Sequence, residues 1–186
     1  MIRIAIVEDS KDDRKELKSF LERYEREKKC ALKITEFDSG INFIEEYKPE
    51  FDLIFMDISM PHMNGMDVAR KLRNKDTGVQ LIFLTSLAKY AVEGYEVNAR
   101  MFLVKPVSYL RISIEMDKIA TAYNSRLWEN LLLNTVEGMV RVNLGSIYYI
   151  QSDKHYVVFH TDMGDYRVRG KLSSFESALD EKHFAR

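Results

Sequence analysis

The sequence predicts an α/β protein with a doubly wound parallel sheet, followed by a smaller, mostly β domain. Over residues 1–122, short apolar runs alternate with amphipathic helical patterns, which is typical of a parallel sheet covered by helices on both faces. After residue 122, short strand patterns follow one another with only turn signals between them. The chain has 186 residues, which is enough for one large domain or two smaller ones.

The strands of the first domain are short and apolar. The runs at 51–56, 79–84 and 101–104 contain almost no polar residue, as is required of strands that are buried on both faces. The five predicted strands are Ile2–Val7, Ala31–Phe37, Phe51–Met56, Val79–Leu84 and Met101–Val104.

Helical patterns lie between and after these strands. Their apolar residues recur at spacings of three and four, so each helix presents one apolar face. The residues expected to face the sheet are Leu17, Phe20, Leu21 and Tyr24 in the first helix, Met66, Ala69 and Leu72 in a later one, and Leu110, Ile114 and Ile119 in the last.

The second domain is predicted to be all-β up to a final helix. Ser173 and Glu176 form a capping box, which predicts a helix that begins there. We expect domain limits of 1–122, a linker or helix extension over 123–130, and a second domain over 131–186. The predicted strands are Leu131–Leu133, Met139–Val142, Ile147–Ile150, Tyr156–His160 and Tyr166–Val168.

Composition and charge exclude several classes of protein. Lys and Arg number 28 against 29 Asp and Glu, so the whole chain has no bulk charge that would favour nucleic acid or a membrane surface. No apolar run is long enough to cross a bilayer. The single cysteine, Cys30, cannot form an internal disulfide, which fits a reducing compartment. We therefore expect a cytoplasmic protein with no membrane partner.

Charged residues follow three of the predicted strands. Glu8 and Asp9 come after the first strand, Asp57 after the third and Lys105 after the fifth. Ligands of open parallel sheets bind at the carboxyl ends of the strands, where the winding direction reverses. In the strand order 2-1-3-4-5 the first and third strands are neighbours at that point, so the three carboxylates are expected to converge.

This combination of residues suits phosphoryl transfer. Three converging carboxylates repel one another, and an oxygen-preferring cation such as Mg²⁺ relieves the repulsion. Asp57 is then placed as a nucleophile that can carry phosphate covalently. Lys105 supplies positive charge and Thr85, which ends the fourth strand, supplies a hydroxyl donor for the phosphoryl oxygens.

Each of these residues also has an ordinary structural interpretation. Asp9 alone could cap a helix, Asp57 could be a turn residue, and Lys105 could be a solvated surface charge. Thr85 could bond to nearby backbone, and Phe102 could be a simple core residue. Independent structural roles would not place all five at one edge of the same sheet, so the joint interpretation is favoured.

The ordered motifs resemble the receiver domain of two-component response regulators over residues 1–122. The resemblance implies a flavodoxin-like sheet of order 2-1-3-4-5, and a protein that is not an enzyme beyond its own phosphorylation and dephosphorylation. The residues that carry it are Glu8-Asp9, Met56-Asp57-Ile58-Ser59-Met60-Pro61-His62-Met63-Asn64-Gly65, Leu84-Thr85-Ser86 and Lys105-Pro106.

The resemblance also implies a role for each residue. Asp57 accepts a phosphoryl group from a sensor histidine kinase. Glu8, Asp9, Asp57 and the Ser59 carbonyl hold Mg²⁺. Thr85 and Lys105 contact the phosphoryl group, and the Lys105–Pro106 bond is expected to be cis.

A switch is implied as well. Thr85 moves toward the phosphoryl oxygens and the ring of Phe102 fills the space that it leaves. Phosphorylated molecules are then expected to pair through the face that includes Tyr90, Val92 and Tyr95.

The tail resembles the first part of a LytTR-type DNA-binding domain, a mostly β family that reads DNA through loops. Because the chain stops at Arg186, before further strands of that family, the second domain is expected to be incomplete, either as a fragment or as a naturally shortened output. The residues that carry the resemblance are Ile147–Val158, Arg169–Glu176 and Phe184–Arg186.

Charge adds little to the DNA-binding interpretation. Basic and acidic residues balance over residues 123–186, whereas DNA binding normally depends on cations. A solvated strand face is at least as good an interpretation of each basic residue. The candidates for DNA contact are Lys154, His155, Arg167, Arg169 and Lys171.

These observations predict a response regulator whose phosphorylation controls dimerisation, promoter binding and transcription. The alternative is a phosphorylation-dependent signalling module whose shortened tail binds protein instead of DNA. A small aspartyl phosphatase is disfavoured because Ser59 stands where such enzymes have a second Asp. A flavin-binding protein is disfavoured because Glu8 and Asp9 would repel a phosphate.

Overall fold

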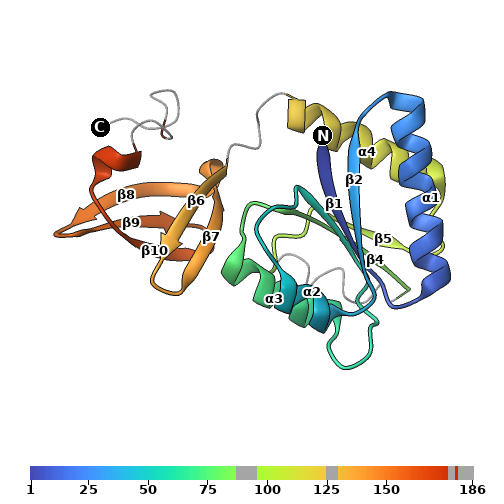
Figure 1. Cartoon of the computed structure of the whole chain (residues 1–186), viewed down its shortest axis with the longest axis horizontal. Helices are drawn as coiled ribbons and strands as arrows, with labels where there is room; N and C mark the ends of the chain where they lie inside the picture. The colour runs from blue at the N-terminus through green and yellow to red at the C-terminus, as the bar shows by residue number, and fades with distance from the viewer. Residues whose placement is uncertain (87–95, 125–129, 176–178, 180–186) are drawn as a thin grey trace.

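The computed structural model describes residues 1–86, 96–124, 130–175 and 179, and these form two sheets (Figure 1). The first sheet is parallel, with the strand order β2-β1-β3-β4-β5. The second is antiparallel, with the order β7-β6-β10-β9-β8. The predicted fold class and the predicted order of the first sheet are confirmed. In the described part of the chain, no helix combines the length and the apolar character needed to cross a membrane.

The parallel sheet is buried because helices cover both of its faces. Every residue of β3, and all but the first of β4, is buried, which explains why these runs are apolar in sequence. The five strands are β1 (Ile2–Val7), β2 (Leu32–Phe37), β3 (Leu53–Met56), β4 (Gln80–Thr85) and β5 (Met101–Val104).

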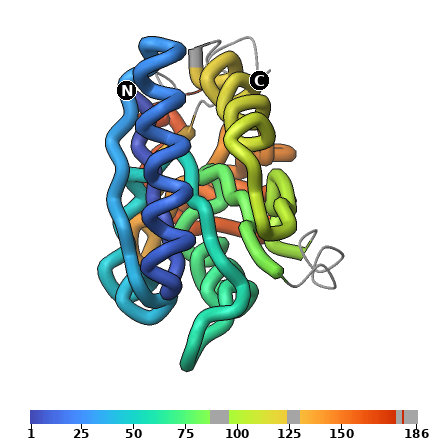
Figure 2. The backbone as a smooth tube through the Cα atoms, turned by 90° about the vertical axis from the view of Figure 1, so that its right-hand side faces the viewer, coloured from blue at the N-terminus to red at the C-terminus, as the bar shows by residue number. Residues whose placement is uncertain are grey.

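Among the described residues, two helices pack on each face. The helices α1 (Lys11–Lys28) and α4 (Tyr109–Asn124) lie side by side on one face (Figure 2). The helices α2 (Gly40–Glu46) and α3 (Gly65–Lys75) cover the other (Figure 1). In α1 and α3 the predicted apolar faces are confirmed, with Leu21 and Leu72 fully buried.

The predicted inner face of α4 is partly wrong. Leu110 is 67% exposed and Ile114 is 43% exposed, whereas Ile112, Met116 and Ile119 are fully buried. Apolar residues lie on both sides of this helix, so spacing alone did not identify the side that packs on the sheet.

The second sheet buries one face over its own core. Leu133, Val142, Val157 and Phe159 are central in this core, and all four are fully buried. A 3-10 turn (Leu172–Phe175) replaces the start of the predicted final helix, and Glu176 of the capping box lies outside the described residues. The strands are β6 (Asn130–Thr135), β7 (Gly138–Asn143), β8 (Ile147–Asp153), β9 (Tyr156–Thr161) and β10 (Gly164–Arg169).

Candidate functional site

The carboxyl ends of the parallel strands bring the predicted site residues together. Backbone hydrogen bonds between neighbouring strands continue one residue past the strand ends, from Asp57 N–H to the Val7 carbonyl (2.9 Å) and from Lys105 N–H to the Thr85 carbonyl (3.0 Å). The side chains that follow these strands therefore meet at one edge of the sheet. A cleft of about 530 Å³ lies there, and Glu8, Asp9, Asp57, Ser59 and Lys105 are among its lining residues.

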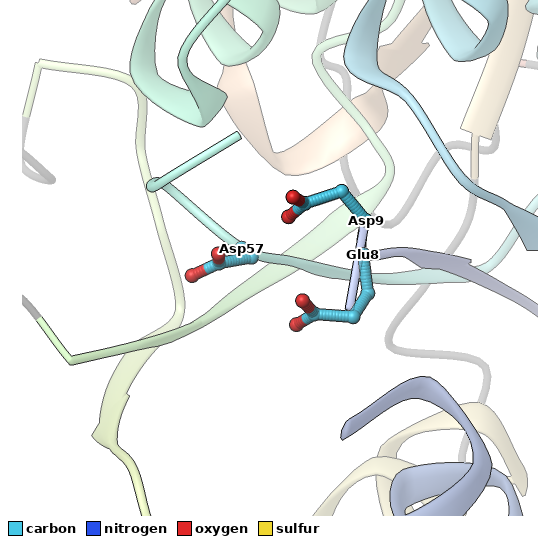
Figure 3. A group of neighbouring side chains, drawn as sticks. All are labelled: Glu8, Asp9 and Asp57. Carbon is cyan, nitrogen blue, oxygen red and sulfur yellow. The ribbon is translucent and has the colours of Figure 1, made fainter. Parts of the chain in front are cut away.

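Three carboxylates converge in this cleft. One oxygen from each of Glu8, Asp9 and Asp57 lies within 4.8 Å of the other two (Figure 3). Glu8 and Asp57 are each only 5% exposed, whereas Asp9 is exposed. Asp57 Oδ1 is buried and has no hydrogen-bond partner among the described residues. The acidic cluster therefore contains an acceptor oxygen that no described residue uses in a hydrogen bond.

Lys105 lies across this acidic cluster. Its Nζ is 2.6 Å from Glu8 Oε2, 2.6 Å from Asp13 Oδ2 and 3.9 Å from Asp57 Oδ1. Asp13 was not identified from the sequence. It lies in the first turn of α1, where its N–H donates to the side-chain oxygen of the N-cap residue Ser10. In a sequence, an acid in the first turn of a helix indicates only a favourable interaction with the helix dipole, and not a contact with Lys105.

Burial shifts the ionisation of the two buried acids. It raises the pKa of Asp57 above its ordinary value, although Lys105 and the N–H groups of Ser59 and Ile58 oppose the shift. Burial also raises the pKa of Glu8, with Lys105 again opposing. For Lys105, burial lowers the pKa, but hydrogen bonds to Asp13 and Glu8 outweigh it and the pKa is raised.

The remaining receiver residues lie next to this cluster. Thr85 is fully buried, and its hydroxyl interacts with the Asp57 carboxylate. The ring of Phe102 is half-buried against Phe83, with ring centroids 4.7 Å apart. The Lys105–Pro106 bond is cis, as expected. Tyr90, Val92 and Tyr95 of the predicted pairing face lie outside the described residues.

A close approach of backbone to backbone shapes the loop after Asp57. The Gly65 N–H donates to the Ile58 carbonyl at 3.0 Å, which returns the chain to the sheet edge. A Cβ atom on residue 65 would lie 2.1 Å from the Asp57 carbonyl oxygen. Only glycine fits there, so the glycine that ends the sequence motif is required by contact with the backbone of Asp57 itself.

The DNA-contact candidates gather at one end of the second sheet. Lys154 and His155 form the β8–β9 turn, and the Gly170 N–H donates to the His155 carbonyl at 3.0 Å. This bond places the end of β10 beside that turn. Arg167 is engaged locally, with its guanidinium 2.9 Å from Asp153 Oδ2. All five candidates are exposed: Lys154, His155, Arg167, Arg169 and Lys171.

Comparison with known proteins identifies both parts of the chain. Residues 4–116 match the response regulator receiver domain family, and residues 137–186 match the LytTr DNA-binding domain family. The sensory transduction protein LytT of Oceanobacillus iheyensis is 30% identical over 189 residues, which cover 94% of this chain and 76% of that protein. LytT of Bacillus subtilis is 29% identical over 198 residues, which cover all of this chain and 80% of that protein.

A solved receiver structure shares the fold of the first domain. The response regulator TrrA of Thermotoga maritima, in complex with Mg²⁺-BeF, is 25% identical with a TM-score of 0.56, over 64% of this chain and 99% of that one. The matched families exclude the phosphatase and flavoprotein alternatives, and they favour a DNA-binding tail over a protein-binding one. The chain belongs to the response regulator receiver family and is a two-component response regulator with a LytTR-type DNA-binding output.

Proposed function

We propose that Asp57 is the phosphoacceptor of this response regulator. A carboxylate oxygen of Asp57 attacks the phosphorus of a phosphohistidine on a sensor kinase, the P–N bond breaks, and an acyl phosphate forms on Asp57. The observation that supports this best is the unpartnered, buried Oδ1 atom of Asp57, which lies 3.9 Å from Lys105 Nζ in an open cleft.

We propose that Glu8, Asp9, Asp57 and the Ser59 carbonyl hold Mg²⁺. The donor set fits, because it consists of oxygens only and three carboxylates lie within 4.8 Å of one another with an unused acceptor among them. When bound, Mg²⁺ supplies charge neutralisation for the phosphoryl oxygens and for the carboxylates. Burial raises the pKa values of Glu8 and Asp57 because it disfavours their charged forms, and a bound cation would favour those charged forms again.

We propose that Thr85 and Lys105 contact the phosphoryl group. We also propose that the ring of Phe102 changes its position when Asp57 is phosphorylated. Thr85 already interacts with Asp57, and Lys105 reaches the same carboxylate from the neighbouring strand end. Movement of Thr85 toward the phosphoryl oxygens would leave space beside β4. The ring of Phe102, on the neighbouring strand β5, already packs against Phe83 of β4 and is placed to fill that space.

Phosphorylated molecules are proposed to pair and to bind promoter DNA through the second domain. Three apolar side chains on β5 and α4 are exposed and available for pairing: Val104 at 52%, Leu110 at 67% and Ile114 at 43%. For DNA, the exposed basic candidates around Lys154 and Arg169 are the contacts we propose. Because the proposed target is promoter DNA, we also propose that the protein is cytoplasmic.

We also propose the domain limits 1–122, 123–130 and 131–186. The last receiver helix ends at Asn124 and the first output strand begins at Asn130. These bounds support a short connection between the two domains.

Replacing Asp57 tests the site. With acetyl phosphate and Mg²⁺, the wild-type chain should gain one phosphoryl group by intact mass and associate by light scattering, whereas Asp57→Asn should do neither. Asp12→Asn is the matched control, since Asp12 is an exposed acid on the first turn of α1. Equal labelling of Asp57→Asn and wild type would show that the acceptor lies elsewhere.

A further inference from the structure

A second buried aspartate, Asp76, lies at the far end of α3 from the phosphorylation site. It is fully buried, and both of its oxygens are used. Oδ1 accepts hydrogen bonds from the N–H groups of Gly78 (2.9 Å) and Val79 (2.8 Å). Oδ2 accepts from the Tyr47 hydroxyl and from the Nε of Arg141 at 2.9 Å.

Arg141 belongs to the output domain, so this ion pair joins the two domains. Arg141 lies on β7, the edge strand that lies beside α3 (Figure 1). Its guanidinium also donates to the Phe51 carbonyl, and its own carbonyl accepts from the Thr77 N–H (2.8 Å) and hydroxyl (3.2 Å). Every partner of Arg141 named here belongs to the receiver.

The surroundings make this contact specific. Burying two charges costs several kcal/mol in desolvation, which is offset only when the pair has good geometry and the remaining polar atoms are satisfied. Asp76, with four donors on its two oxygens, meets that condition in the docked arrangement. If the domains separated, Asp76 would lose its ion pair with Arg141, and Arg141 would lose its anion. The contact therefore favours one docked orientation over many loose ones.

The same helix connects this contact to the phosphorylation site. The helix α3 begins at Gly65, which touches the Asp57 carbonyl, and it ends beside Asp76. In the last turn of α3, the buried guanidinium of Arg73 donates to the Asp76 carbonyl (3.1 Å). It also donates to the carbonyls of Val97 (2.7 Å) and Asn98 (3.1 Å), in the segment that leads into β5 and Phe102.

We propose that the Asp76–Arg141 ion pair holds the output domain against the receiver in the unphosphorylated chain and that phosphorylation of Asp57 weakens it. The reason is geometric: a change in the loop after Asp57 acts on the first residue of α3, and a buried ion pair tolerates little displacement. The DNA-contact candidates remain exposed in the docked arrangement. The ion pair therefore restricts the orientation of the output domain without covering those residues. The coupling to phosphorylation rests on the proposed role of Asp57.

Small-angle X-ray scattering of the 186-residue chain tests the docking. Arg141→Ala should raise the radius of gyration, because it removes the interdomain pair. Asp76→Asn should do the same while keeping an oxygen acceptor for the N–H groups of Gly78 and Val79. Arg167→Ala is the matched control, since it removes an exposed arginine from the same sheet, and it should leave the scattering unchanged. Folding of each variant is verified by circular dichroism.

Calorimetric titration with beryllofluoride in saturating Mg²⁺ tests the coupling. Because coupling free energies are reciprocal, loss of the ion pair should tighten beryllofluoride binding by about 5-fold or more in Arg141→Ala and Asp76→Asn, but not in Arg167→Ala. Wild-type scattering from both folded variants would overturn the docking. Altered scattering with unchanged beryllofluoride affinity would overturn the coupling. If the wild-type chain itself binds no beryllofluoride, the assignment of Asp57 fails and the coupling fails with it, while the scattering still decides the docking.

Discussion

Two buried aspartates of the receiver, Asp57 and Asp76, differ in how their oxygens are used. Asp76 has a hydrogen-bond or charged partner on both oxygens. Asp57 keeps one buried oxygen without a hydrogen-bond partner among the described residues, in a cleft shared with two further acids. A buried polar atom without a partner is costly, and at Asp57 this atom lies in a cleft beside two further acids, which supports the proposal of a ligand site there.

The comparison also separates two ways of burying a negative charge. At Asp76 the charge is matched by Arg141 across the domain boundary, which makes it part of the architecture. At the Asp57 site one lysine is shared among Glu8, Asp13 and Asp57, so the acids outnumber the cation. The first arrangement stabilises a contact between the domains, and we propose that a cation and a phosphoryl group complete the second.

The largest effect is expected from removing the satisfied carboxylate. Asp76→Ala should lower the free energy of unfolding by about 3–5 kcal/mol, because it leaves Arg141 buried without its anion and two N–H groups without an acceptor. Urea titration followed by circular dichroism measures it. A loss below about 1 kcal/mol would show that the contact is not buried in solution.

A smaller effect of opposite sign is expected at the proposed phosphorylation site. Asp57→Asn should raise the free energy of unfolding at neutral pH without Mg²⁺, by on the order of 1 kcal/mol, since it removes a buried charge that the folded state disfavours.

The gain in free energy of unfolding of Asp57→Asn should depend on pH, because the pKa of Asp57 is raised in the folded state. The folded state binds the Asp57 proton more tightly than the unfolded state. Above the folded-state pKa, the buried charge of Asp57 therefore lowers the free energy of unfolding of the wild-type chain, and this loss disappears as the pH falls. The difference between Asp57→Asn and wild type should therefore shrink toward zero below the ordinary pKa of an aspartate. A difference that grows on acidification would contradict a raised pKa.

The smallest effect is expected on the exposed face of the output domain. Asp153 and Arg167 form an ion pair 2.9 Å long, with side chains 43% and 52% exposed. Asp153→Ala should change the free energy of unfolding by less than about 0.5 kcal/mol in the same urea titration. A loss comparable to that of Asp76→Ala would mean that burial is not what distinguishes the two carboxylates.

Several features of the receiver could be predicted from local pattern because the physics behind them is local. A run of apolar residues in a parallel sheet must be buried on both faces, so β3 and β4 were recognisable. Acids that follow neighbouring strands of such a sheet must meet at its edge, so Glu8, Asp9 and Asp57 were expected together. The inner face of α4 was not predictable in this way, because Leu110 and Ile114 are as apolar as the residues that pack inside.

The sequence by itself determined the alternation of strands and helices in the first domain, the acids that end its strands and the change to an all-β second domain, because each follows from patterns that span a few residues. The strand order 2-1-3-4-5 was an expectation from the resemblance to receiver domains, and the structure confirms it. Only the tertiary structure decided that Asp13 shares Lys105 with Glu8, and that Asp76 in the receiver is paired with Arg141 in the output domain. Those partners are separated by 92 and 65 positions in the chain, and no local spacing records which charges the packing of two domains brings within 3 Å.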